Sequence, residues 1–417
     1  MLKPTRMARM GTVATALAAI GALSLSGCTP AATDNPTDTA SASAAGECGS
    51  VPQLGANDPN GLLDDFSADV KAGYNAYGIE VQESAWADWK SDKTEGFTAA
   101  IVGQAPAAPY IATYQAQLLE SLKAQDVEVV ANLAPNDPTD VPGQIQMFNQ
   151  ALSLQPDIIF LNPAAPEAAI DLVAQAHDAG IPVISTVVPL DSPYAISLTN
   201  NSNLQAMETA AGVLGAIGGS GTVLQVDGVP GIPPQLFFED GIAKALELCP
   251  DVSIVGQVQG FFQPPAAQQA VVQYLATNPA GVDAVFQAGS MGWAIRDAFE
   301  QAGMPVPPIQ DINASQGMAA YAAANPDYPY FGTATPPIPA AKAAAQIGLK
   351  VLAGAGPKVN QIAWGPYVVD QENIGDVVDP SWSESDGTDL TVDGVYLTDD
   401  QIAEFFNNPE LGPQTAE

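Results

Sequence analysis

The sequence predicts an α/β protein made of two Rossmann-like lobes with parallel sheets, joined by a hinge. From residue 97 onward, short apolar runs alternate with amphipathic stretches, which is the pattern of βα units around a parallel sheet. This series occurs twice, and 417 residues exceed what one compact core usually holds. We therefore expect a first lobe at 98–199 with 336–360 and a second lobe at 200–335 with 361–375.

The N-terminus has the pattern of a secretory signal. Three cations open it: Lys3, Arg6 and Arg9. The apolar stretch that follows, 12–25, is shorter than the roughly 20 residues that a spanning helix needs. It ends in Leu-Ser-Gly-Cys at 25–28, which resembles the lipobox of bacterial lipoproteins. The resemblance implies removal of residues 1–27 and a lipid on Cys28 that anchors the protein at the extracytoplasmic face of the cell membrane; the alternative is an ordinary export signal with an incidental cysteine.

Residues 28–50 are predicted to form a flexible stalk. They are mainly Ala, Thr, Ser, Asp and Pro, and they offer too little apolar surface to offset the entropy of ordering. Once Cys28 carries a lipid, Cys48 and Cys249 are the remaining cysteines. An oxidising compartment would allow a disulfide between them, but sequence alone leaves open whether they pair.

Two further regions flank the predicted lobes, an N-terminal extension at 51–97 and a C-terminal extension at 376–417. The first is too aromatic for a linker, with Tyr74, Tyr77, Trp86 and Trp89. The second contains Trp382, Tyr396 and an amphipathic stretch at 399–407. We expect both to pack on a lobe as ordered additions, although either could instead bind a partner.

The predicted strands are continuous apolar runs rich in β-branched residues, as expected of buried parallel strands. In the first lobe they are Thr98–Gly103, Val127–Asn132, Asp157–Asn162 and Pro182–Val188. In the second lobe they are Thr222–Asp227, Val252–Val258, Asp283–Gln287 and Ile309–Asn313. The chain is expected to cross between the lobes near Asn200 and Thr335. A ligand in the cleft would meet residues just after each strand, because loops at the carboxyl ends of strands line the crevice of open α/β sheets.

Composition excludes several classes of function. Against 46 acidic residues the chain has 12 basic ones, a formal net charge of -34, so it would repel a phosphate backbone rather than bind nucleic acid. The single histidine, His177, argues against a Ser-His-Asp hydrolase or a multi-histidine metal site, and we expect it on the solvated surface. The glycines at 228–231 lack the spacing of a phosphate loop. We expect no enzyme activity, no cofactor and no metal.

The stretch from Phe97 to Gly375 resembles the type I periplasmic binding proteins, specifically the ribose- and galactose-type sugar receptors of ABC importers. The matching motifs are Ala108-Pro109-Tyr110 (the family's N-P-F), Asp157–Pro163 (D-A-I-I-L-x-P), Ala179–Ile184 (A-G-I-P-V-I), Gly228–Gly241 (G-x-x-G and a later Gly) and Val282–Phe286 (D-A-V-F). The resemblance implies a monomeric receptor that closes on a small solute and delivers it to a membrane permease. The alternative function is a surface sensor that signals through a membrane receptor or kinase.

In that family the sugar lies between aromatic rings, while carboxylates, asparagine and arginine bind its hydroxyls. The resemblance implies that Tyr110 supplies the ring of the first lobe and that Phe261 and Phe262 supply the ring of the second. The polar anchors of the family are replaced at Ala108, Val187-Val188, Leu236–Phe238, Gly289-Ser290 and Asn313. Charge-assisted hydrogen bonds are worth roughly 1.5–3 kcal/mol each, so ordinary ribose or galactose recognition is not expected.

We expect instead a neutral, less hydroxylated or partly apolar solute between aromatic faces. Neutral hydrogen bonds to this solute would come from Asn162, Asn200, Ser290 and Asn313. Phe238 and Trp293 are candidate rings of the cleft, with core packing as an equal alternative. The predicted ligand-binding residues are therefore Tyr110, Asn162, Asn200, Phe238, Phe261, Phe262, Ser290, Trp293 and Asn313.

Overall fold

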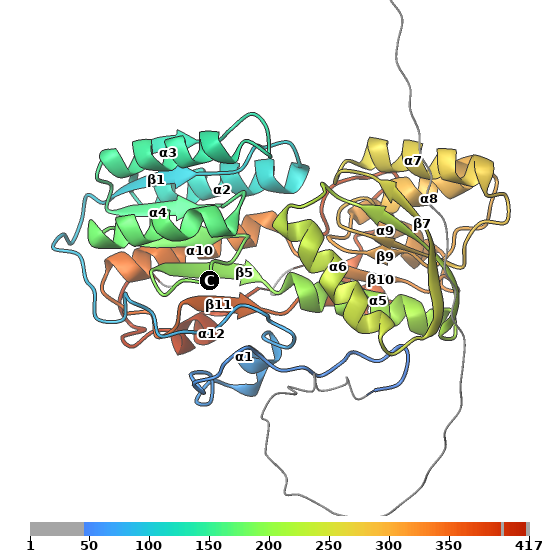
Figure 1. Cartoon of the computed structure of the whole chain (residues 1–417), viewed down its shortest axis with the longest axis horizontal. Helices are drawn as coiled ribbons and strands as arrows, with labels where there is room; N and C mark the ends of the chain where they lie inside the picture. Colours follow the sequence, from blue (N-terminus) through green and yellow to red (C-terminus); the bar gives the residue numbers. More distant parts are fainter. Residues whose placement is uncertain (1–45, 393–395, 414–417) are drawn as a thin grey trace, which may run out of the picture. The chain divides into compact units, whose positions relative to one another are not determined.

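The computed structural model describes residues 46–392 and 396–413, with helices flanking the sheets (Figure 1). They form one six-stranded sheet and two three-stranded sheets, which a single bridge links and which are called together the second sheet below. The predicted signal peptide at 1–27, the lipidation site Cys28 and the stalk up to residue 45 lie outside the described residues. Within the part of the chain that the structure describes, no helix is long and apolar enough to cross a membrane.

The first sheet has six parallel strands in the order β11-β5-β4-β3-β1-β2. These are β1 Thr98–Val102, β2 Glu128–Leu133, β3 Ile158–Leu161, β4 Val183–Thr186, β5 Ala195–Asn200 and β11 Gln361–Trp364. Alternate residues of β1 and β3 enter two different apolar cores. Helices α2 (Pro109–Ala124) and α10 (Pro337–Leu352) pack on the first core, and α3 (Val141–Ser153) and α4 (Pro166–Asp178) pack on the second. Both faces of the sheet are therefore covered, as parallel sheets require.

The second sheet contains the strands of the other half. These strands are β6 Ser220–Asp227, β7 Asp251–Gln259, β8 Ala284–Gln287, β9 Gln310–Asp311, β10 Phe331–Ala334 and β12 Tyr367–Asp370. Strands β7, β6 and β8 pair in parallel, and a single bridge from Val285 to Ile309 links β8 to the group β9, β10 and β12. Strand β12 is antiparallel to β10. The accompanying helices are α5 Ser202–Ala216, α6 Pro233–Leu246, α7 Pro264–Thr277, α8 Gly292–Gln301, α9 Gln316–Ala324 and α11 Ile374–Val377.

The structure differs from the expected strands in three respects. Strands β5, β10, β11 and β12 were not predicted, because their four to six residues do not form a continuous apolar run; β10, for example, is Phe-Gly-Thr-Ala. Strand β11 pairs with β5, so the expected boundary that placed 361–375 with the second lobe is wrong for Gln361–Trp364. Strands β2 and β7 form sheet edges rather than buried strands, and Val255 of β7 is 49% exposed.

The N-terminal extension packs on the first sheet. Tyr74 and Trp86 are fully buried in the core below α2 and α10. The Tyr74 hydroxyl donates to the carbonyl of Gln361 at 2.7 Å, and the amide of Ala363 donates back to it at 3.2 Å. The short helix α1 (Ala68–Ala72) precedes this contact. The extension thus covers the outer edge of β11, which would otherwise offer unpaired backbone groups.

The C-terminal extension contacts both halves. The amide of Leu390 donates to the carbonyl of Ala314 at 2.7 Å beside α9. Further along, helix α12 (Asp399–Glu404) is capped by Thr398, and Phe405 and Phe406 are buried in the same core as Tyr74.

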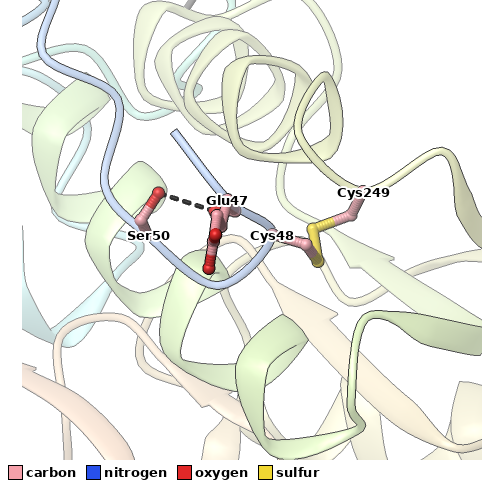
Figure 2. The surroundings of a disulfide bond; sticks show 4 residues. All are labelled: Glu47, Cys48, Ser50 and Cys249. Carbon is pink, nitrogen blue, oxygen red and sulfur yellow. Dashed lines mark hydrogen bonds between the residues drawn. A yellow bond between two sulfur atoms is a disulfide. The ribbon is translucent and has the colours of Figure 1, made fainter. Parts of the chain in front are cut away.

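Cys48 and Cys249 are joined by a disulfide (Figure 2). The bond fixes the chain before the N-terminal extension to the loop between α6 and β7. A Cβ on Gly49 would lie 2.9 Å from Cα of Gly215 in α5. The last residues of the predicted stalk are therefore packed against the second half, so the stalk prediction is wrong at its end.

His177 lies in an aromatic cluster rather than on the open surface. Its ring is 5.1 Å from that of Trp86 and 4.4 Å from that of Tyr194, measured between centroids. The Trp86 indole donates to the carbonyl of Tyr194 at 2.7 Å. The histidine therefore helps attach the N-terminal extension to α4, while 33% of its side chain stays exposed, so the expected solvated position holds in part.

Candidate functional site

A cavity of about 150 Å³ lies at the carboxyl ends of strands from both sheets. Residues that end or follow the strands of the first sheet line it: Gln104, Val187 and Asn200. Residues that follow the strands of the second sheet line it from the other half: Val229, Phe261, Ser290, Asn313 and Thr335. Open α/β sheets hold their ligands at this edge.

Aromatic rings supply much of the cavity wall. Tyr110 and Tyr114, one turn apart in α2, stack at 6.3 Å between ring centroids. The other rings that line the cavity are Phe237, Phe238, Phe261, Phe262 and Trp364. Burial raises the pKa values of the Tyr110 and Tyr114 hydroxyls above their ordinary range, so both hydroxyls stay neutral.

The Phe261–Phe262 loop is held in place by the end of β6. The amides of Gly260 and Phe261 donate to the carbonyl of Asp227 at 2.8 and 3.1 Å. The Phe262 ring rests on the backbone of Gly228, where a Cβ would come within 2.1 Å of Cζ of the ring. Glycine is therefore required at position 228 for the ring to occupy its place.

Backbone strain is concentrated at this cavity. Five of its lining residues have a positive φ although they are not glycine: Val187, Phe261, Phe262, Ser290 and Asn313. Val187, with φ of 68°, is a marked outlier because its branched side chain disfavours this region. Such strain persists only where the surrounding structure enforces it, and it is typical of ligand sites.

The polar groups of the cavity are all neutral. They are Gln104, Asn200, Ser202, Gln205, Gln263, Ser290, Asn313 and Thr335. Among the described residues that line the cavity, none is charged, and the described chain contains no cluster of ligating side chains that could hold a metal. A charged solute would have to leave water without a compensating charge, which is costly.

The two halves are in contact at the cavity. Nε2 of Gln263, at the start of α7, donates to the carbonyl of Ala107 at 2.8 Å. Ala107 lies in the loop between β1 and α2. Because both residues also line the cavity, this hydrogen bond joins loops from opposite halves at the wall of the cavity.

Most of the predicted ligand-binding residues line the cavity, but two do not. Those on the lining are Tyr110, Asn200, Phe238, Phe261, Phe262, Ser290 and Asn313. Phe238 is only 2% exposed and belongs to the second core, so the alternative of core packing holds for most of its ring. Asn162 is absent from the lining and only 3% exposed; Gln104 lines the cavity instead, with Nε2 donating to the carbonyl of Pro163. Trp293 packs against the second core, where a Cβ on Gly387 would lie 3.2 Å from its ring. The C-terminal extension therefore covers Trp293, away from the cavity.

The lining residues that the sequence reasoning missed include Gln104, Gln205 and Trp364. Gln104 directly follows a predicted strand, so the rule about strand ends could have found it. Gln205 lies in the first turn of α5 and Trp364 at the end of the unpredicted β11. No signal in the sequence marks either of them.

A buried carboxyl lies next to the cavity without lining it. Asp311 is fully buried in β9, and burial raises its pKa to about 7. The Tyr330 hydroxyl donates to one of its oxygens at 2.9 Å, while the other has no hydrogen-bond partner among the described residues. Arg296, also buried, donates to Asp297 and lies over the ring of Tyr321. It does not reach the cavity.

Comparisons with known proteins agree with this architecture. The model of the periplasmic binding protein domain matches residues 99–356. A xylitol-binding protein of Mycolicibacterium smegmatis is 25% identical over 199 residues, which cover 46% of this chain and 54% of that protein. The chain therefore matches only about half the length of this curated relative.

Two solved structures share the fold. A solute-binding protein of an ABC transporter from Thermobispora bispora superposes with a TM-score of 0.59 at 24% identity, covering 70% of this chain and 92% of that one. One from Mycobacterium smegmatis, with bound glycerol, gives 0.60 at 18% identity, covering 72% and 100%. The predicted fold class, two parallel-sheet halves of the periplasmic binding protein type, is thereby confirmed.

The matched family consists of binding proteins rather than enzymes. The two sheets, the cavity at their strand ends and a family match over more than half of the sequence lead to the same assignment. The chain belongs to the periplasmic binding protein domain family.

Proposed function

We propose that the protein is an extracytoplasmic, lipid-anchored receptor that captures a small neutral solute and delivers it to an ABC importer. The observation that carries the proposal is the uncharged cavity between strand ends of the two sheets. The related proteins named as xylitol-binding or crystallised with glycerol support a sugar-like or polyol solute.

The wall of the cavity favours a guest with at least one apolar face. Rings from α2, α6 and the Phe261–Phe262 loop surround it, and stacking on rings removes apolar surface from water at about 25 cal/mol per Å². Neutral hydrogen bonds contribute about 1 kcal/mol each, less than those of charged anchors. A sugar derivative with few free hydroxyls fits this combination better than a free hexose.

Hinge closure would transmit binding to the permease. The guest stabilises the closed state in proportion to its differential affinity for the two states. The hydrogen bond from Gln263 to Ala107 can form only when the loops of the two halves are together. The permease would recognise this closed arrangement.

Calorimetric titration tests the solute class. We expect an O-methylated pentose or hexose to bind more tightly than free ribose or galactose, and small-angle X-ray scattering should show a decrease in radius of gyration on binding; titration with xylitol and glycerol tests the polyol class. Micromolar binding of a free pentose or hexose would overturn the preference for a less hydroxylated guest. Binding of charged solutes alone would overturn the proposed function.

The lipid anchor has a separate test, because Cys28 lies outside the described residues. Cells fed a radiolabelled fatty acid should label the wild-type protein, and Cys28→Ala should abolish the label and release the protein from membranes. Equal labelling of both proteins would contradict the anchor.

A further inference from the structure

Gln205 connects the two halves of the cavity through one side chain. It lies in the first turn of α5, directly after the chain crosses from the first sheet, and is 3% exposed. Its Oε1 accepts from Nδ2 of Asn200 at 2.8 Å. Its Nε2 donates to Oδ1 of Asn313 at 2.9 Å and to the Thr333 hydroxyl at 2.7 Å. A single amide therefore joins the ends of β5, β9 and β10.

These bonds determine which atoms of the two cavity asparagines remain for a guest. Nδ2 of Asn200 is used by Gln205, and its Oδ1 is buried without a partner among the described residues. Oδ1 of Asn313 accepts from both Gln205 and Thr335, which leaves its Nδ2 as the unused group. The second half thus keeps a donor for a guest, whereas Oδ1 of Asn200 has almost no accessible surface and cannot be reached from the cavity.

Neither asparagine could hold this orientation alone, because an amide presents an acceptor and a donor of nearly the same shape. Gln205 supports the orientation seen in the structure, since one uncharged amide can accept from Asn200 on one side and donate twice on the other. A carboxylate could accept from Asn200 but could not donate to Asn313.

The geometry points to Gln205 as the positioning residue that sets specificity in the proposed solute site: together with the Thr335 hydroxyl it fixes Asn313 as a donor, and it thereby selects a neutral guest that accepts a hydrogen bond on the side of the second half. This inference rests on the proposed function for the identity of the site. It names the hydrogen-bonding polarity of the guest, which the proposed function does not.

The test uses Gln205→Glu, Gln205→Leu and the matched surface control Gln150→Glu, with xylitol and glycerol as probes. Gln205→Leu should weaken binding at least ten-fold at every pH. In Gln205→Glu a protonated carboxyl can still donate, so the ratio of its dissociation constant to that of wild type should rise at least ten-fold between pH 5 and pH 8. Gln150→Glu should follow wild type, because Gln150 is an exposed residue of α3.

A measurement without ligand separates this inference from the proposed function. In asparagine-labelled protein, the side-chain amide signal of Asn313 should shift between pH 5 and pH 8 in Gln205→Glu, as Nδ2 turns toward the introduced carboxylate. It should not shift in Gln150→Glu. A signal that is the same in all variants, or a pH-independent affinity ratio, overturns the role of Gln205. Failure of wild type to bind either probe contradicts the polyol proposal, while the amide signal still decides on Gln205.

Discussion

Breaking the disulfide between Cys48 and Cys249 should destabilise the protein strongly. The two cysteines are 201 residues apart, so the bond closes a loop that contains the whole of the first sheet except β11. The chain-entropy relation gives ~5 kcal/mol at 25 °C for a loop of 201 residues. Strain and residual structure usually lower such values, and we expect ~3–5 kcal/mol.

Differential scanning calorimetry can measure this effect. For a chain of this size the unfolding entropy corresponds to a decrease in Tm of about 4–7 °C on reduction. The double variant Cys48→Ser/Cys249→Ser should give a similar decrease. Reduced wild type is the better comparison, because Cys249 is only 1% exposed and a buried serine hydroxyl adds a cost of its own.

The result also tests how the extension is attached. Cys48 lies on the second half, while Tyr74 and Trp86 are buried in the core of the first. Nδ2 of Asn201, at the crossing between the halves, donates to the carbonyls of Gly73 and Asn75 at 2.9 and 2.7 Å. If reduction changes Tm by less than 1 °C, the reasoning fails, because the loop would not be constrained in the unfolded chain.

Three further predictions concern pH, the Phe262 ring and Trp293. The free energy of unfolding should fall as pH rises from about 4 to about 7: burial raises the pKa values of Asp311 and Glu208 to about 7, so the folded state keeps protons that the unfolded state has lost. Urea titrations at several pH values should show this decrease, and Asp311→Asn should reduce the decrease by up to ~4 kcal/mol; a free energy of unfolding that does not depend on pH would contradict the prediction. Gly228→Ala should weaken solute binding at least ten-fold, since its Cβ would displace the Phe262 ring, whereas Gly375→Ala, with no atom within 4 Å of the new Cβ, should not; equal affinities would refute the placement of the ring. Trp293→Phe should leave solute affinity within two-fold of wild type while lowering Tm, because Trp293 packs on the second core; a large loss of affinity would show instead that Trp293 contacts the solute.

The sequence predicted eight strands whose apolar runs are nearly continuous. It missed β5, β10, β11 and β12, where polar residues or a glycine interrupt or flank a short apolar run and pairing partners come from other parts of the chain. Strand β11, for instance, pairs with β5 some 160 residues earlier in the sequence. Periodicity carries no information about such partners.

The candidate site was predictable to the extent that it follows strand ends. Asn200, Ser290 and Asn313 were expected in this way and line the cavity, whereas the rings of Phe261 and Phe262 were expected from the family resemblance. Asn162 also ends a predicted strand, yet its side chain is buried behind the lining. Position along a strand gives the edge of the sheet, whereas the direction of the side chain depends on tertiary packing.

The neutral site and its strained backbone have one explanation in common. Without charged anchors, each hydrogen bond to a guest contributes little, so affinity depends on groups that are already in place before binding. Positive φ angles at Phe261, Phe262 and Asn313 hold rings and an amide in positions that relaxed backbone would not give. The favourable packing of the surrounding core offsets the strain energy of that backbone; Val226, Val285 and Phe286 are fully buried in this core. A cavity organised in this way should discriminate between neutral solutes by shape and hydrogen-bonding polarity rather than by charge.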